Sequence, residues 1–127
     1  MKATLISMLI VAALAAGICV FSVLLIGNIS DEMEEMRISV LELIDADDRA
    51  GALRKLGQMK EAWSGHEDAL AILASHDDIH EITELIIESG AYLEAGDTND
   101  FSRSMELLGE AIGHLRREER PSLANVL

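Results

Sequence analysis

The stretch that most constrains this chain is residues 3–27, which contain no charged side chain. A helix rises about 1.5 Å per residue, so these residues would form a helix of about 37 Å. The hydrocarbon core of a bilayer is about 30 Å thick, and such a helix crosses it with some tilt. We therefore predict a transmembrane anchor over residues 1–29, in which residues 3–27 contact membrane lipid.

A cleavable signal peptide is the alternative, because Ala13-Leu14-Ala15 has the small residues of a cleavage site. Signal peptides have apolar cores of about 7–15 residues, whereas residues 17–26 prolong the apolar run here. An uncleaved anchor is therefore the favoured interpretation. Cys19, the sole cysteine, follows Ile18 rather than the small residue that lipoprotein processing needs, so we interpret it as a lipid-facing or packing side chain.

The charges on the two sides of the anchor predict its orientation. Lys2 and the amino terminus precede it, and Asp31 and Glu32 open an acidic stretch after it. Because positive charge stays in the cytoplasm, the N-terminus should lie inside and the domain of residues 30–127 outside. That domain holds nine basic and 23 acidic side chains, a net charge of −14, which repels nucleic acid and anionic lipid.

After the anchor, apolar residues recur at alternating steps of three and four, the spacing of an amphipathic helix. The stripes are Ile29, Met33, Met36, Val40 and Leu43; Ala52, Leu56, Met59, Trp63, His66, Leu70 and Leu73; Ile79, Ile82, Ile86 and Leu93; and Phe101, Met105, Leu108, Ile112 and Leu115. Capping residues between them predict helices at 30–45, 48–74, 78–95 and 99–119, the first continuous with the membrane helix and the last stopped by Pro121. The predicted fold is all-α, with one N-terminal transmembrane helix and a small bundle of about four helices in two hairpins.

Glycines interrupt these predicted helices, and each costs about 1 kcal/mol relative to alanine. They are Gly57, Gly65, Gly90, Gly109 and Gly113. One explanation is close helix contact, with Gly109-xxx-Gly113 admitting another backbone; the other is a domain that stays loose until a partner docks. Within the anchor, Ala12-xxx-Ala16 and Ala13-xxx-Gly17 would also let two copies approach, so a homo-oligomer is possible.

The histidines are the residues most open to a chemical interpretation. His76 and His80 lie one helical turn apart, a spacing that can place two imidazoles on one metal ion, with Asp77, Glu81 or Glu84 completing its shell. The alternative is a pair that packs at, or caps, a helix start, because the glutamate of a zincin helix is missing.

His66 stands three residues after Trp63 in an apolar stripe. We expect a partly buried side chain there, with proton sensing as the alternative.

No motif for catalysis is present in the sequence. It has no Gly-rich phosphate loop, no Ser or Cys nucleophile with a spaced base, and no basic–aromatic surface for nucleic acid. We therefore predict no catalytic residue, no cofactor-binding residue, no cofactor and no enzymatic activity.

Several features together resemble a known family. They are Met1-Lys2 before a single membrane helix, a helix with Trp63, His76 opening the next helix, and the ending Ser122-Leu123-Ala124-Asn125-Val126-Leu127. In this order they resemble the domain of unknown function 4363 (DUF4363), a family of small bacterial membrane proteins found mainly among Firmicutes. The resemblance covers nearly the whole chain and implies recurring positions at Trp63, His76 and Asn125. The resemblance implies no activity and no cofactor. This chain departs from the family's lysine-bearing pattern, because it is more acidic and richer in glycine.

A membrane-anchored helical interaction or accessory protein is predicted. The prediction rests on the apolar anchor, on the absence of catalytic motifs from the sequence and on the resemblance to DUF4363. We expect it at the outer face of a bacterial cytoplasmic membrane, where it would bind another protein or a second copy of itself. The alternative is a divalent-metal or pH-responsive accessory protein that uses His76, His80 and nearby carboxylates.

Overall fold

A computed structural model describes the backbone of residues 1–126 and the side chains of residues 1–117. Within this part of the chain the regular structure is helical. The elements are α1 (Lys2–Asp45), α2 (Arg49–Leu73), α3 (His76–Ala95) and α4 (Thr98–Val126). The prediction of an all-α chain, with a first helix continuous through the apolar stretch, is confirmed.

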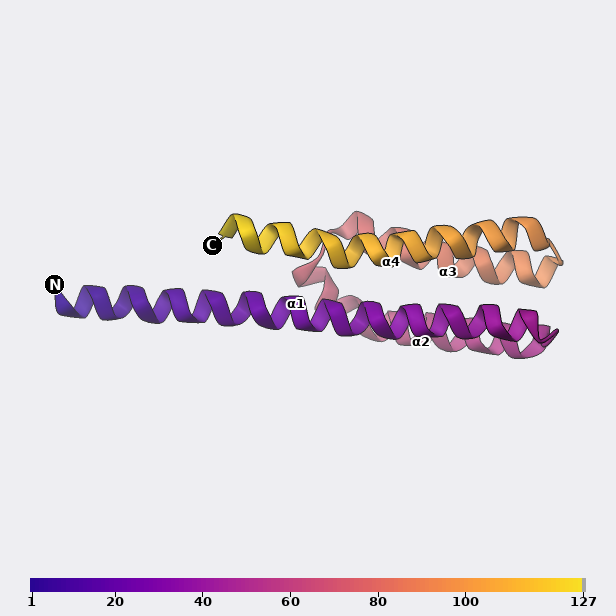
Figure 1. Ribbon diagram of the computed structural model, residues 1–127, viewed down its shortest axis with the longest axis horizontal. Helices are drawn as coiled ribbons and strands as arrows, with labels where there is room; N and C mark the ends of the chain where they lie inside the picture. Colours follow the sequence, from indigo (N-terminus) through magenta and orange to yellow (C-terminus); the bar gives the residue numbers. More distant parts are fainter. Residues whose placement is uncertain (127) are drawn as a thin grey trace.

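The helices form a ring in which each contacts two neighbours. α1 contacts α2 and α4, and α3 contacts the same two helices. Because the connections are short, neighbouring helices run antiparallel, in the up-down-up-down order of a four-helix bundle (Figure 1). The end of the bundle with the α2–α3 turn, called the base below, is the end from which α1 projects (Figure 1). The other end, called the tip, holds the α1–α2 and α3–α4 turns.

α1 has two halves with different surroundings, although its 44 residues form one unbroken helix of about 66 Å. Its N-terminal half extends past the base, and its large apolar side chains are exposed (Figure 1). These are Leu5, Ile6, Met8, Leu9, Ile10, Val11, Leu14, Ile18, Val20, Phe21 and Leu24. Its C-terminal half buries one face in the bundle, beginning with Ser22 and Ile26. Ile26, which the sequence placed in the lipid-contacting segment, therefore belongs to the bundle core together with Ile29, the first residue of the predicted stripe.

The core is aliphatic, as the few aromatic residues of the sequence required. Trp63 and Phe101 are its aromatic members, and each is at most 2% exposed. The Trp63 indole Nε1 donates a hydrogen bond of 2.8 Å to Thr83 Oγ1 and so ties α2 to α3. A buried indole N–H needs such a partner, because leaving it unpaired costs the desolvation energy of the group.

The helices begin and end at capping residues, as the sequence predicted. The Asp48 carboxylate accepts from Gly51 N at 2.9 Å at the start of α2, and Ser75 Oγ accepts from Asp78 N at 3.1 Å at the start of α3. Gly96 ends α3 in the left-handed conformation, with φ 75°, which glycine adopts without a Cβ clash.

The predicted stop at Pro121 is wrong, because α4 continues to Val126. Proline removes one backbone donor from a helix, but the other hydrogen bonds of the turn can persist on either side of it. Beyond the base, this end of α4 runs alongside α1 (Figure 1).

Candidate interaction surfaces

His76 and His80 lie in the first turns of α3, at the base of the bundle. Their rings are nearly parallel, with centroids 6.3 Å apart, and His80 Nε2 lies 3.0 Å from Glu84 Oε1. The helix is capped by Ser75 and not by His76. Within residues 1–117, no group of three or more His, Cys, Asp and Glu side chains is arranged to hold a metal ion. The two imidazoles share a helix face, as the sequence predicted, but the described residues bring no third ligand to them.

The other histidines join neighbouring helices. His66, half-buried on α2, lies 2.9 Å from Glu32 Oε2 of α1. His114 of α4 lies 3.7 Å from Asp78 Oδ1 of α3. His66 is thus partly buried, as expected, and its polar partner comes from the first helix.

The seam between α1 and α4 is closed by the Arg37 guanidinium. Nε and Nη2 donate to Glu34 at 2.8 and 2.5 Å, and Nη1 donates to the Met105 carbonyl of α4 at 3.2 Å. The hydrogen bond to Glu34 raises the pKa of Arg37, so the cation persists at any physiological pH. A Cβ added at Gly109 would lie 2.8 Å from Arg37 Cζ. The expectation that Gly109 admits another backbone is wrong: a side chain occupies the space.

Arg116 makes a second link across this seam, closer to the base. Its Nη2 donates to the Gly27 carbonyl at 2.8 Å and to Asp31. The sequence placed Arg116 only near the C-terminal end of the last predicted helix, at 99–119. It could not have revealed the link, because Gly27 is 89 positions away along the chain.

The seam between α2 and α3 is open by comparison. A groove of about 370 Å³ runs along it. Its lining consists of Leu53, Leu56, Gly57, Lys60, Ile86, Ile87, Gly90, Ala91 and Glu94. A Cβ at Gly57 or Gly90 would meet no atom within 4 Å. These two glycines therefore do not serve close packing within the chain, and the groove they line is the first candidate surface for a partner.

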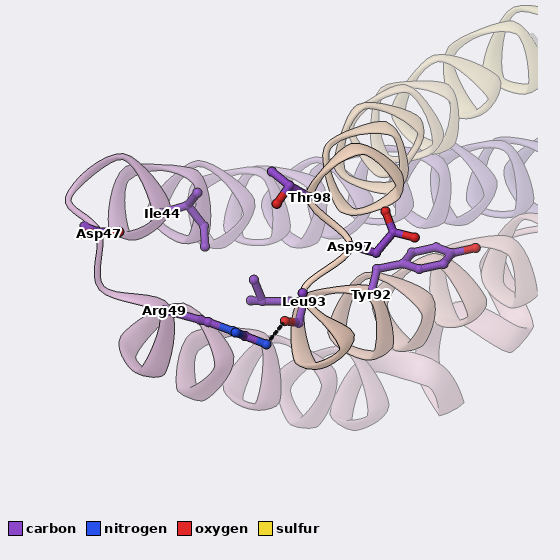
Figure 2. Close-up of a pocket in the computed structure, with 8 residues that line it drawn as sticks. Ile44, Asp47, Arg49, Tyr92, Leu93, Asp97 and Thr98 are labelled. Atoms are coloured by element: carbon purple, nitrogen blue, oxygen red, sulfur yellow. Dashed lines mark hydrogen bonds between the residues drawn. The ribbon is translucent and has the colours of Figure 1, made fainter.

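A pocket of about 300 Å³ with a mixed polar and apolar lining lies at the tip, between the two turns. Figure 2 shows Asp47 and Arg49 at the first turn on one side of the pocket and Tyr92, Asp97 and Thr98 near the second turn on the other, with the Tyr92 ring directed away from Arg49. Arg49 Nη2 donates to the Leu93 carbonyl at 2.5 Å (Figure 2). It also donates to the Glu94 carbonyl at 2.6 Å. These bonds add a donor to the last carbonyls of α3, of which that of Leu93 also accepts from Gly96 N at 3.2 Å. Arg49 therefore links the start of α2 to the end of α3.

The comparison with protein families bears on the whole bundle. A family model described as Domain of unknown function (DUF4363) matches residues 20–126. The chain belongs to this family. The DUF4363 match begins just before Ser22, the first buried residue of α1, and so covers the bundle but little of the projecting half of that helix. Neither a curated protein nor a solved structure matches the chain.

The positions that the DUF4363 resemblance singled out differ in their surroundings. Trp63 is a core residue with a hydrogen bond to α3. His76 is exposed at the start of α3. The side chain of Asn125 lies outside the described residues. Packing in the core therefore explains Trp63, whereas the His76 ring stacks on His80 at the surface of α3.

Proposed function

We propose that this protein is a membrane-tethered helical bundle that acts by binding another protein chain. The observation that carries the proposal is the division of α1. One uninterrupted helix has a half whose apolar side chains are exposed on all sides and a half that builds the core of the bundle. Among the described helices, α1 alone is long and apolar enough to cross a membrane.

The exposed apolar half is hard to explain without a bilayer. Apolar side chains cover this helix on every face over residues 3–21. In water, this apolar surface would stay exposed, which is unfavourable. About 20 apolar residues match the thickness of the hydrocarbon core. Because no break separates the halves of α1, the bundle would be held upright, with its base facing the membrane.

The charges support an orientation with the bundle outside the cytoplasm. Lys2 precedes the apolar half, and the first charge after it is Asp31, which lies on the bundle side with a net charge of −14. Under the positive-inside rule, this distribution favours an N-terminus in the cytoplasm. We propose the outer face of a bacterial cytoplasmic membrane as the location.

The proposal that binding is the activity follows from the surfaces. Three of the described polar contacts link helices: Arg37 of α1 with the Met105 carbonyl of α4, Arg116 with Asp31, and His66 with Glu32. One open feature is the α2–α3 groove, which has a glycine on each side, apolar side chains such as Ile87, and the charged Lys60 and Glu94. Such a surface fits a protein partner better than a small polar substrate.

Topology and retention test the anchor. A C-terminal reporter that is active only outside the cytoplasm should work, and one that is active only inside should not. The intact chain should stay in the membrane fraction after an alkaline wash. The opposite reporter pattern, or release of a shorter form that starts near Ala16, would contradict the proposal.

A further inference from the structure

The α2–α3 groove is the feature that packing within the bundle leaves unexplained. Gly57 and Gly90 lie on its two sides, with nothing within 4 Å of an added Cβ. Each costs its helix about 1 kcal/mol against alanine, and no contact inside the chain uses the space. Ile87, with 48% of its surface exposed, lies in the same groove. Small residues beside an exposed apolar side chain allow another helix to pack closely.

The two helices that line the groove carry opposite charge near the tip. The first half of α2 has four basic residues and no acidic one before Glu61, whereas the half of α3 that ends at the tip has Glu88 and Glu94 and no lysine or arginine. Lys60 and Glu94 lie in the groove itself. Among the described side chains, no ion pair involves Arg54, Lys60 or Glu94. These charges are therefore available to a partner.

We propose that the groove docks the same groove of a second copy of this chain. The two copies would stand side by side in one membrane, related by a two-fold axis along the membrane normal. That axis places α2 of each copy beside α3 of the other at the same height. An isologous interface has to be self-complementary, and a groove with one basic and one acidic wall meets this condition.

Contacts within the chain fix the residues that meet in this pair. Near the tip, Arg49 of α2 is level with Glu94 of α3, because it donates to the Glu94 carbonyl at 2.6 Å. Nearer the base, Trp63 is level with Thr83 through their bond of 2.8 Å. Interpolation between these two levels puts Gly57 at the height of Ile87. In the pair, the glycine of one copy then receives the isoleucine of the other.

The same comparison of heights brings Arg54 of one copy near Glu94 of the other. Side chains lean toward the N-terminus of their helix, so Arg54 leans toward the tip and Glu94 leans toward the base. The guanidinium of each copy therefore approaches the carboxylate of the other, and the symmetry makes this pair twice. The inference rests on the proposed anchoring, because a shared membrane keeps the copies parallel and raises their local concentration.

Mixed cysteine crosslinking in membranes tests the pairing. Two differently tagged full-length chains, both with Cys19→Ser, are expressed together; one carries Gly57→Cys and the other Ile87→Cys. Oxidation should give a disulfide between the two tags. The matched control replaces Gly57→Cys by Ser102→Cys, an exposed position on α4, and should give none. Trp63 emission checks that each variant is folded, because Trp63 is the only tryptophan.

Charge reversal then tests the geometry. Glu94→Arg in both chains should lower the disulfide yield about fivefold to tenfold, because two pairs turn from attraction to repulsion. Adding Arg54→Glu to the same chains should restore the yield. Equal yields from the Ser102→Cys control, or no disulfide from chains that stay in the membrane after an alkaline wash, would overturn the pair but not the anchor. Chains that leave the membrane in that wash would overturn the anchored function and the parallel pair together.

Discussion

Glycines lie at two seams of this bundle, the α1–α4 seam and the α2–α3 seam, and their surroundings there are opposite. Between α1 and α4, a glycine makes room for a guanidinium, and the Arg37 side chain fills the space beside Gly109 while bonding to both helices. Between α2 and α3, Gly57 and Gly90 make room that no atom of the chain fills. The difference teaches that a glycine within a helix does not by itself indicate close helix packing. What the neighbouring helix places opposite it decides its role.

The largest effect is expected where the seam is filled. Gly109→Leu should lower the free energy of unfolding by about 2–3 kcal/mol, because the new side chain displaces Arg37 from its bonds. Urea titration of the detergent-solubilised chain, followed by Trp63 fluorescence, measures this. Gly57→Leu is the matched control at the open seam and should not destabilise the monomer. Similar losses at both positions would contradict the contrast between the seams.

Removal of the guanidinium should cost somewhat less. Arg37→Ala leaves the half-buried Glu34 carboxylate without its partner and removes the bond to the Met105 carbonyl, so we expect a loss of about 2 kcal/mol. Arg54→Ala, which removes a side chain without an ion pair among the described residues, should stay within about 0.5 kcal/mol of the wild type. The same urea titration compares the two variants, and equal effects would show that Arg37 does not hold the seam.

Replacement of a glycine at the α2–α3 seam should stabilise the monomer, whereas replacement of Gly109 should destabilise it. Gly90→Ala should raise the free energy of unfolding by about 1 kcal/mol in dilute detergent, because alanine favours the helix and its Cβ meets nothing. If the groove pairs with a second copy, the same variant should also reduce crosslinking in membranes. A loss of monomer stability would mean that the α2–α3 seam is as tightly packed as the α1–α4 seam.

The smallest effect concerns the histidines at the base of the open seam. The metal-dependent alternative predicts that His80→Ala lowers the zinc affinity by about tenfold. The binding function proposed above predicts indistinguishable zinc titrations of the wild type and this variant, because the described residues give His76 and His80 no third ligand. Isothermal titration calorimetry on the detergent-solubilised chain decides between them.

The elements of this fold were predictable because their signals are local. The spacing of Met33, Val40 and similar residues gave the helices, and Asp48 and Ser75 gave two of their starts. Each of these signals involves residues within a turn or two of one another. The C-terminal end of α4 was missed, because a proline signals a stop only when the surrounding helix is not otherwise supported.

The surfaces were far less predictable. The sequence singled out His76 and His80, which share a helix face at the base, but it did not find Arg37 or Arg116. It listed Gly57, Gly90 and Gly109 together, although their surroundings differ. No signal along the chain separates them, because the atoms opposite each glycine belong to another helix.

The sequence by itself determined the apolar half of α1, the positions of the turns and the acidic character of the bundle. These follow from hydrophobicity, capping and charge, which each residue carries wherever it lies. Only the tertiary structure decided that Arg37 reaches Met105, 68 positions away, and that Gly57 and Gly90 line one empty groove. Those facts depend on the order of the helices in the ring and on the rotation of each about its axis. Both are set by the packing of all four helices at once, which no local pattern encodes.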